Sequence, residues 1–394
     1  MRIIIDVMSG DHAPDEIIRG ASMAAHEFDV DITIVGNREI IRRVAFVNDI
    51  DISHLTIEHA KSVIDMEDSP MEVVRGKRDS SMSVGLHMLA AGKGDAFVSA
   101  GNTGALVTGA TLIVRRIKGI QRAGIATVLP FPVPVLLMDS GANLNVTSEH
   151  LEQFAFMGAK YMEKTYGIDR PRVGLLNNGT EYNKGTPLRV EAYALLKEQK
   201  RLNFIGNVEG KEVPFNVCDV LVTDGFVGNI FLKLTEGMGK FMLHTLKDVF
   251  HTNLMVYLSA ATMKGQIARM KKQFDASEHG GAPLLGISKP VIKAHGNSDA
   301  MAIQNAVFQA MTFVSTGIND DIASFAAEQE AERYRHNVEA QMDAMYEAGE
   351  GREAPVEEEG EEDPIPTPSP KDKKRQLRAM KKAKKEQKKK KHSL

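Results

Sequence analysis

The chain has 394 residues, of which 43% are hydrophobic and 26% are charged, and its formal net charge is −3. One cysteine and no tryptophan are present, which excludes a disulfide scaffold and a cysteine-rich zinc site. The N-terminus reaches Asp6 too soon for a signal-peptide core, and the longest uncharged stretch, 96–114, contains glycines and hydroxyl residues that suit a buried strand-loop-helix. The composition predicts a soluble, cytoplasmic enzyme.

Short β-branched runs alternate with helical patterns through residues 1–336. The expected strands are 3–7, 32–35, 55–58, 96–99, 126–129, 135–138, 173–176, 203–205, 220–223 and 291–293. The expected helices are 14–27, 105–116, 149–166, 187–199, 229–250 and 299–316. Near-continuous apolar strands that alternate with helices predict an α/β fold, with a mostly parallel sheet covered on both faces.

Polar, glycine-rich segments follow most of the expected strands. They are 8–14, 99–104, 139–143, 177–186, 223–229 and 295–299, with 279–283 in the loop region before the last strand. Because ligands bind outside the carboxyl ends of parallel strands, we expect these loops to surround one cleft at one edge of the sheet. Glycines and helix N-termini favour an anion there, although each loop alone also fits a tight turn. The usual nucleotide-binding motifs are missing after the first strand.

Eight of these motifs, in order, carry a resemblance to a known family. They are Gly-Asp-His-Ala-Pro at 10–14, Met-Glu-Asp-Ser-Pro at 66–70, Ser-Ala-Gly-Asn-Thr-Gly-Ala at 99–105, Asp-Ser-Gly-Ala-Asn at 139–143, and the segments 203–210, 224–229, 280–286 and 295–300. Over about residues 1–317 the chain resembles bacterial phosphate acyltransferases of phospholipid synthesis. These enzymes make acyl-phosphate from acyl-acyl carrier protein and inorganic phosphate. The family usually has glycine where Ser9 stands, and the charged C-terminal tail is no part of its pattern.

The resemblance implies a three-layer α/β/α fold of the isocitrate and isopropylmalate dehydrogenase type, and a homodimer. It implies that no metal and no cofactor takes part. It also implies peripheral attachment to the inner face of the cell membrane, where a membrane glycerol-3-phosphate acyltransferase would use the product.

Three residues are the candidates for catalysis. Phosphate is largely dianionic near neutral pH, so the enzyme must orient it and stabilise the oxyanion more than deprotonate it. Lys184, in a glycine-rich loop ahead of the helix from Pro187, can pair with phosphate or the oxyanion; the alternative is an exposed loop lysine. Asn229 can donate its amide to the same oxyanion, or cap the helix that it begins. His12 can bind phosphate or protonate the leaving thiolate, or can be a structural histidine.

The other expected substrate contacts are listed here. They are Gly101, Asn102, Thr103 and Gly104 as the phosphate cradle, together with Asn143, Asp224, Gly281, His295, Asn297 and Ser298. Asp224 would repel phosphate, so we assign it to orienting Lys184 or fixing its loop. Cys218 directly precedes a strand, has no adjacent cation, and is expected to be a small core residue. We therefore expect direct transfer, without a covalent acyl-enzyme.

A helical segment at about 250–275 is expected to protrude. It has no charge between His251 and Lys264, and basic residues follow at Lys264, Arg269, Lys271 and Lys272. An apolar tip followed by cations suits contact with anionic lipid, through Leu254, Met255, Tyr257 and Leu258; core packing or a dimer contact is the alternative. The same basic residues can serve the acidic acyl carrier protein.

The end of the chain differs from the rest in charge. Residues 371–394 carry 13 basic and 2 acidic side chains, after a proline-rich stretch with nine acids at 347–370. Such a composition cannot bury a core, so we expect a body of 1–336 and a disordered tail of 337–394. The lysines can attract anionic lipid or remain solvated; without interleaved aromatics, nucleic acid ranks last, and no specific nucleic-acid partner is expected.

Two rival functions remain open at this point. One is a metal- and NAD-dependent β-decarboxylating dehydrogenase on the same fold, which would need clustered aspartates for the metal. The other is a scaffold without catalytic activity, held to membrane or RNA by its tail.

Overall fold

The computed structural model of the protein describes residues 1–250, 265–266 and 280–350. The chain divides into two compact units, Met1–Tyr334 and Arg335–Leu394, close to the expected boundary at 336. The second unit is described only as far as Glu350.

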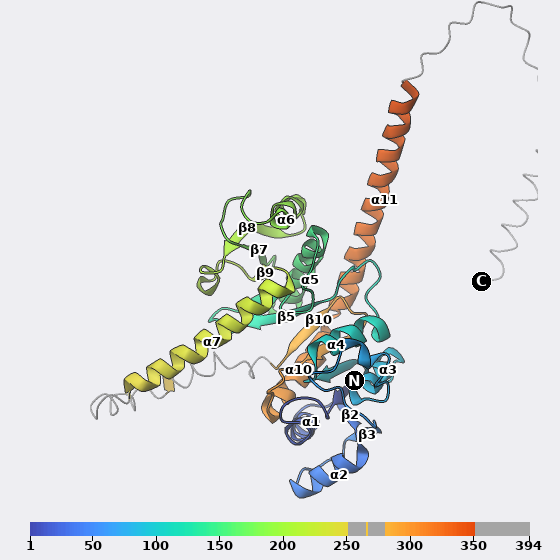
Figure 1. Cartoon of the computed structure of the whole chain (residues 1–394), viewed down its shortest axis with the longest axis vertical. Coiled ribbons are helices and arrows are strands. Elements are labelled where there is room, and N and C mark those ends of the chain that lie inside the picture. The colour runs from blue at the N-terminus through green and yellow to red at the C-terminus, as the bar shows by residue number, and fades with distance from the viewer. Residues whose placement is uncertain (251–264, 267–279, 351–394) are drawn as a thin grey trace, which may run out of the picture. The chain divides into compact units, whose positions relative to one another are not determined.

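An eleven-stranded sheet runs through the first unit (Figure 1), in the order β3-β2-β1-β4-β11-β10-β5-β6-β9-β7-β8. The strands are β1 (Arg2–Asp6), β2 (Asp31–Gly36), β3 (Thr56–His59), β4 (Ala96–Ser99), β5 (Gly124–Leu129), β6 (Val135–Met138), β7 (Arg172–Asn177), β8 (Asn203–Glu209), β9 (Val220–Val222), β10 (Ala282–Leu285) and β11 (Val291–Lys293). Each of the ten expected strands is present, and β10 is an addition to them.

The sheet consists of two parallel halves that run in opposite directions. Strands β1, β2, β3, β4 and β11 are parallel to one another, and so are β6, β7, β8 and β9. Between the halves, β10 is antiparallel to both β11 and β5, and β5 is antiparallel to β6. The expectation of one shared edge is therefore wrong: loops after β1, β4 and β11 leave from one edge, and loops after β6, β7 and β9 leave from the other.

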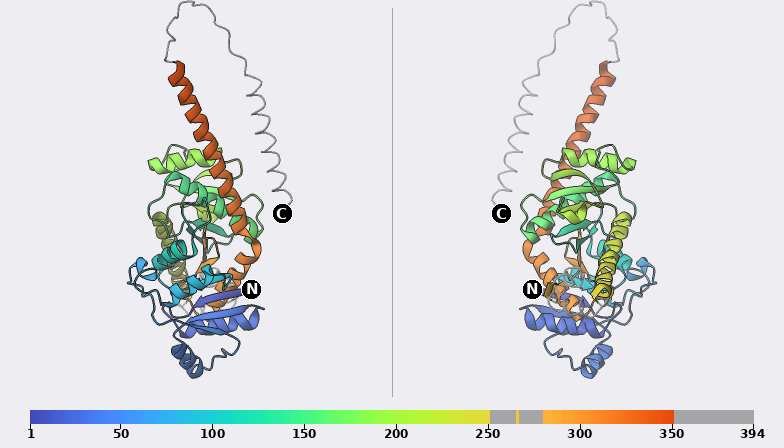
Figure 2. Two further views of the ribbon diagram at one scale, coloured as in Figure 1. Left: turned by 90° about the vertical axis from the view of Figure 1, so that its right-hand side faces the viewer. Right: turned by 90° about the vertical axis from the view of Figure 1, so that its left-hand side faces the viewer.

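Helices cover both faces of the sheet, as the alternating side chains of β1 illustrate. Ile3 and Ile5 pack with apolar residues of α1, α10 and α5, whereas Ile4 packs on the opposite face with residues of α3 and α4. Successive strand side chains point to opposite faces, so a strand that is apolar throughout requires a cover on each side. The three-layer α/β/α arrangement is confirmed (Figure 2).

The helices of these layers have the following bounds: α1 (Asp15–Glu27), α2 (Arg38–Val47), α3 (Ser81–Ala90), α4 (Thr103–Gly109), α5 (Ser148–Tyr166), α6 (Pro187–Glu198), α7 (Gly225–Phe250), α10 (Ala300–Thr316) and α11 (Ile318–Glu350). Helices α1 and α10 pack closely, because a Cβ at Gly20 of α1 would lie 2.5 Å from the Ala300 carbonyl oxygen. Helices α2, α3 and α11 are additions to the expected set. The expected helix at 105–116 is α4 followed by a π-helical turn, Ala110–Val114.

Helix α11 continues into the region expected to be disordered. It runs to Glu350, through residues 337–350, which are rich in alanine, glutamate and methionine and lack proline. These residue types favour a helix, and the prolines begin only at Pro355. The expected start of the disordered tail is therefore corrected from 337 to beyond 350, and the rest of the tail lies outside the described residues. No helix among the described residues is long and apolar enough to cross a membrane.

Candidate functional site

The loops after β1, β4 and β11 meet at one edge of the sheet. The His12 Nε2 donates a hydrogen bond to Oδ1 of Asn297, and the Asp11 amide donates to the Gly296 carbonyl oxygen at 2.8 Å. Because the Nε2–H is engaged, a neutral His12 keeps only the Nδ1 lone pair, and it can act as an acid only as the imidazolium. We call these three loops, with His12, Asn297 and their neighbours, the His12 group.

Glycines allow the backbones of the His12 group to approach one another. Gly10 has a φ of +123°, and a Cβ there would lie 3.0 Å from the Ala100 Cβ. A Cβ at Gly101 would lie 2.8 Å from the Ser9 Cβ. Only glycine fits both positions without a shift of neighbouring atoms. The expected cradle segment at 101–104 thus lies directly against the loop of His12.

Asn102 has a structural role in this group. Its Oδ1 accepts the Ala105 amide and caps α4, while its Nδ2 donates to the carbonyl oxygens of Asp65, Met66 and Asp68. Gly104 lies against Pro70, where a Cβ would be 2.9 Å from the ring. The side chain of Asn102 is therefore occupied by the fold, which leaves Thr103 and Gly104 as the cradle residues that can face a ligand.

Lys293, at the end of β11, belongs to the His12 group and was missed by the sequence analysis. Its ammonium donates to the carbonyl oxygens of Ala100 and Ala294, and so ties the loop after β4 to the loop after β11. Burial lowers the pKa of Lys293 from 10.5 to about 8, an effect that the nearby Asp11 partly opposes. The available signal was a lysine at the carboxyl end of an otherwise apolar strand.

His295 and Ser298 complete the His12 group. Burial lowers the pKa of His295 below its ordinary 6.5, and the charges of Lys233, Lys293 and Lys240 lower it further. The imidazole is therefore neutral at pH 7, and its Nδ1 accepts the Asn297 amide at 3.2 Å, which leaves an Nε2–H to donate. The hydroxyl of Ser298 is buried and has no hydrogen-bond partner among the described residues. A buried hydroxyl without a partner is costly unless a ligand supplies one.

A second group of loops follows β6, β7 and β9. Asp139 is fully buried, and its carboxylate accepts the backbone amides of Ile125, Gly141, Ala142 and Asn143. The Asn143 side chain donates to Asp139 and to the Ala123 carbonyl oxygen, and the Asn143 carbonyl accepts the Gly225 amide at 2.7 Å. The structure thus gives the Asn143 side chain the task of holding this loop against the start of α7.

Arg189 and Asp224 form a buried ion pair in this second group. The Nη2 of Arg189 lies 2.6 Å from Asp224 Oδ2 and 3.0 Å from Thr223 Oγ1, and its Nε donates to the Leu176 carbonyl oxygen. The other oxygen of Asp224 accepts the Val227 amide in the first turn of α7. Of the two roles expected for Asp224, fixing the loop is supported, whereas its observed cationic partner is Arg189. The sequence analysis did not single out Arg189, which a helical pattern had assigned to a helix.

Lys184 and Asn229 both lie next to this ion pair. Lys184 is exposed, and its carbonyl accepts the Asn177 side-chain amide at 3.0 Å; the following residue, Gly185, has a φ of +93° and packs against Arg189. Asn229 is exposed in the second turn of α7, and its side chain lies against Gly141. We call Lys184, Asn229, Arg189 and Asp224 the Lys184 group.

Helix α7 connects the two groups, although their loops leave from opposite edges of the sheet. It starts at Gly225 in the Lys184 group, and Lys233 and Lys240 of the same helix lower the pKa of His295 in the His12 group. Asn229 lies one helical turn, about 6 Å, before Lys233. The lysines of α7 and Lys293 give the His12 group a positive potential that favours an anion.

The remaining candidate residues lie away from both groups. Gly281 is at the start of β10, where a Cβ would lie 2.7 Å from the Ile292 side chain, so its glycine is explained by packing. Cys218 is buried in a small apolar cluster, as expected. The expected membrane residues Leu254, Met255, Tyr257 and Leu258, and the basic residues after them, lie outside the described residues.

The fold and the two loop groups define an α/β enzyme with a cationic, amide-rich site for an anion. Two solved structures show the same fold: phosphotransacetylases from Streptococcus pyogenes (TM-score 0.55, 19% identity, 80% of this chain and 94% of that one) and Staphylococcus aureus (0.51, 15%, 80% and 94%). Both identities are low enough that the likeness concerns the fold alone.

Sequence comparisons extend across the same region. The model of the family described as "Fatty acid synthesis protein" matches residues 1–321. A phosphate acyltransferase from Thermoanaerobacter pseudethanolicus is 47% identical over 324 residues, 82% of this chain and 96% of the relative. One from Caldanaerobacter subterraneus subsp. tengcongensis is 44% identical over 320 residues, 81% of this chain and 95% of the relative. The chain therefore belongs to the phosphate acyltransferase family.

Proposed function

We propose that the enzyme transfers a fatty acyl group from acyl-acyl carrier protein to inorganic phosphate, giving acyl-phosphate for phospholipid synthesis. The observation that carries this proposal is the His12 group, which combines a positive potential with a buried, unpartnered hydroxyl at Ser298. An oxyanion ligand satisfies both, because it accepts hydrogen bonds and carries negative charge. The relatives, which are named phosphate acyltransferase, support phosphate as the anion.

Phosphate binds in this proposal to Ser298, to the Nε2–H of His295 and to the amides at Thr103 and Gly104. Its oxygen attacks the thioester carbonyl, and the carbon–sulfur bond breaks to release the carrier-protein thiolate. Lys184 and the Asn229 amide stabilise the oxyanion that forms on the carbonyl oxygen. The Arg189–Asp224 ion pair holds both of these residues in position, while Lys293 holds the loops of the phosphate site together.

Attack by phosphate is direct, without an acyl-enzyme. The only cysteine of the chain, Cys218, is buried, and burial raises the pKa of its thiol to about 12. The reactive species of a cysteine is the thiolate, which is scarce at neutral pH when the pKa is so high. No metal or other cofactor is assigned a role in the reaction.

The test of the reaction is phosphate-dependent release of free thiol from palmitoyl-acyl carrier protein. We expect release to require phosphate and to yield an acyl-phosphate that hydroxylamine traps as a hydroxamate. Thiol release that is equally fast without phosphate would show a thioesterase instead. Dependence of turnover on added NAD and Mg²⁺ would favour the dehydrogenase alternative.

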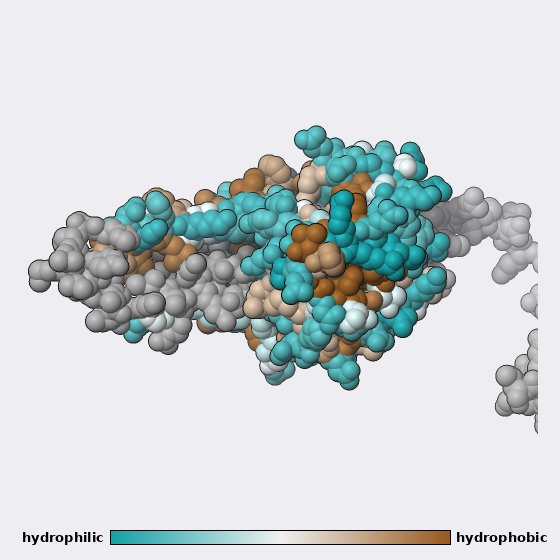
Figure 3. Space-filling view, turned by 90° about the horizontal axis from the view of Figure 1, so that it is seen from below, coloured by the Kyte–Doolittle hydropathy of each residue, from teal (hydrophilic) through white to brown (hydrophobic). Residues whose placement is uncertain are grey.

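Assembly and location follow from the same proposal. Helix α7 exposes a row of large apolar side chains, Ile230, Leu234, Met238 and Phe241, on one face. Figure 3 shows hydrophobic surface along the part of the molecule that carries α7. We assign this face to a homodimer contact, because an apolar row of this size is unfavourable in water.

The enzyme is cytoplasmic in this proposal and binds the inner face of the cell membrane reversibly. The apolar segment with Leu254, Met255, Tyr257 and Leu258 contacts lipid, and a membrane glycerol-3-phosphate acyltransferase consumes the product. Replacing Leu254 and Leu258 with Asp is expected to abolish sedimentation with anionic liposomes and to spare turnover in solution. Unchanged sedimentation would assign the lipid contact to another segment.

A further inference from the structure

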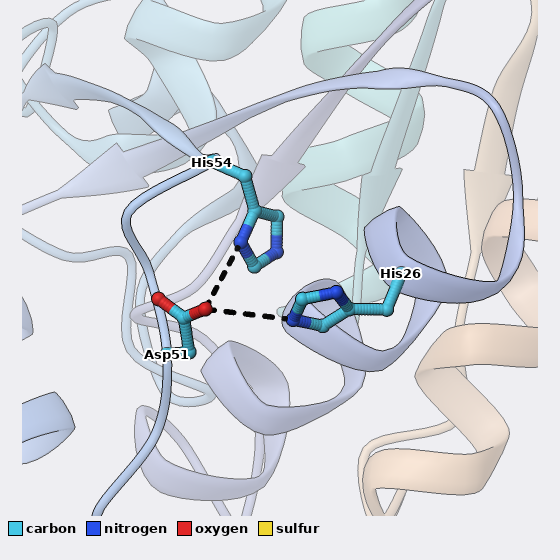
Figure 4. A group of neighbouring side chains, drawn as sticks. All are labelled: His26, Asp51 and His54. Atoms are coloured by element: carbon cyan, nitrogen blue, oxygen red, sulfur yellow. Dashed lines mark ion pairs between the residues drawn. The ribbon is translucent and has the colours of Figure 1, made fainter.

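Two histidines and an aspartate meet on the surface of the first unit (Figure 4). His26 lies in the last turn of α1, and Asp51 and His54 lie in the connection between α2 and β3. The Oδ2 of Asp51 is 3.7 Å from His26 Nε2 and 3.7 Å from His54 Nδ1. One ligand atom from each residue lies within 4.8 Å of the other two.

These distances are close to those of a metal site. Zinc binds histidine nitrogen and carboxylate oxygen at about 2.0–2.2 Å, so two ligands of a tetrahedral ion are about 3.3–3.5 Å apart. The observed 3.7 Å contacts approach that value, and all three side chains are partly or largely exposed and free to adjust. In Figure 4 both imidazoles direct a nitrogen toward the carboxylate.

Neighbouring contacts hold the carboxylate in place. The Ser53 amide donates to the other oxygen of Asp51 at 2.9 Å, which leaves Oδ2 for the two histidines. The Ser22 hydroxyl donates to the Asp51 carbonyl oxygen at 2.7 Å, and this bond fastens the connection to α1 one turn before His26. Partners that orient a ligand in this way are a regular part of metal sites.

We propose that His26, Asp51 and His54 bind a divalent transition-metal cation of the Zn²⁺ type. Two imidazoles with one carboxylate suit Zn²⁺ and similar ions, whereas Mg²⁺ and Ca²⁺ prefer oxygen ligands alone. Water completes the coordination, because the cluster is open to solvent.

The location indicates a structural site. The cluster lies ahead of β2 and β3, at the amino ends of these strands, whereas the loop of His12 follows the carboxyl end of β1. Helix α1 separates His26 from His12 by 11 helical residues, about 17 Å. The metal therefore joins the end of α1 to the connection before β3, and it takes no part in the acyl transfer.

The test is titration of the full chain with Zn²⁺, followed by calorimetry, in parallel with the variants His26→Gln, His54→Gln and Asp51→Asn. The matched control is His87→Gln, because His87 is an exposed histidine on α3 outside the cluster. We expect each cluster variant to lose one equivalent of bound Zn²⁺ or to bind it at least 10-fold more weakly. The control is expected to bind like the unaltered chain.

A second readout is the melting temperature with and without Zn²⁺. We expect Zn²⁺ to raise it in the unaltered chain and in the control, and to raise it less in each cluster variant, because binding to the folded state alone stabilises that state. Mg²⁺ at the same concentration is expected to have no such differential effect. Identical Zn²⁺ stoichiometry and affinity in the folded cluster variants and the control would overturn the proposal, and so would a chain that takes up no Zn²⁺.

Discussion

Asp224 is paired with Arg189, and this pairing explains how a carboxylate can lie beside a site for an anion. Both side chains are buried, and the guanidinium lies 2.6 Å from Asp224 Oδ2. The ion pair is neutral as a unit, so it does not repel phosphate, while its hydrogen bonds fix the first turn of α7. A pattern in sequence gives no signal of this partnership, because residues 189 and 224 are brought together only by the fold.

At the residue scale, we predict that Lys184→Ala lowers turnover by about 100-fold or more, as expected for the loss of an oxyanion contact. Lys184 is exposed, so the melting temperature should stay within a degree or two of the unaltered chain. The control is Lys197→Ala, an exposed lysine in the last turn of α6. Initial rates of thiol release measure the effect, and a folded variant with full turnover would remove Lys184 from the site.

A second prediction at this scale concerns Lys293, whose pKa is lowered by burial from 10.5 to about 8 in the folded state. Below pH 8 the lysine is charged in both states, and folding bears the cost of burying the charge. Between pH 8 and 10.5 only the unfolded lysine keeps its proton, so the free energy of unfolding rises with pH. From pH 7.5 to 9.5 we expect a rise of about 2 kcal/mol, relative to Lys293→Met.

Urea unfolding of the two chains at both pH values measures this difference, because titrations elsewhere cancel between them. Lys293→Met should also raise the KM for phosphate, since the loops after β4 and β11 lose their shared contact. A pH dependence that is the same in both chains would show that Lys293 has an ordinary pKa.

Cys218 provides the third prediction. Its thiol is buried, with a pKa raised to about 12, and it lies in an apolar cluster away from both loop groups. Cys218→Ala should therefore retain turnover within about twofold, with a loss of stability of about 1 kcal/mol for the cavity. Hydroxylamine trapping of an acyl group on the unaltered protein, with turnover abolished in Cys218→Ala, would establish a covalent intermediate.

At the scale of elements, the strands could be predicted from sequence, while β10 and the direction of the two halves could not. Each apolar run bounded by polar residues is a strand, because burial on both faces requires apolar side chains throughout. Strand β10 begins after two glycines and contains Pro283, which are signals of a loop. The reversal between β11 and β6 depends on antiparallel pairing of β10 and β5, and pairing leaves no mark in the local pattern.

Helix α2 was missed although its signals are present. Asn37 caps it by accepting the amides of Glu39 and Ile40, and Ile41 and Ala45 form its buried face. The candidate site shows the same division. The loops rich in glycine and asparagine were located from sequence, whereas the Arg189–Asp224 pair and the buried amine of Lys293 depend on contacts between distant segments.

The prediction at the element scale concerns α7. If its apolar row forms a dimer contact, Leu234→Asp with Phe241→Asp should convert the protein to a monomer, because two buried charges cannot be accommodated in an apolar interface. Exposed Lys247→Asp on the same helix is the control for added negative charge. Light scattering after size exclusion gives the mass, and an unchanged mass for the double variant would place any dimer contact elsewhere.

At the scale of the whole molecule, the family model ends at residue 321, so the charged segment lies beyond the part that the relatives share. Both loop groups and every side chain to which we assign a step lie within residues 1–321. A chain cut after residue 350 retains α11 as the structure describes it and loses the 13 basic side chains of 371–394. We predict that this chain keeps full turnover with palmitoyl-acyl carrier protein.

The same truncation should weaken binding to anionic vesicles, since each basic residue near the membrane surface contributes about 1 kcal/mol and the contribution falls with added salt. Sedimentation with vesicles at low and high salt measures this, with neutral vesicles as the control. A truncated chain that sediments like the full chain at both salt concentrations would show that the tail takes no part in lipid binding. Loss of turnover in the truncated chain would mean that the tail contributes to the reaction itself, which the position of the site within 1–321 argues against.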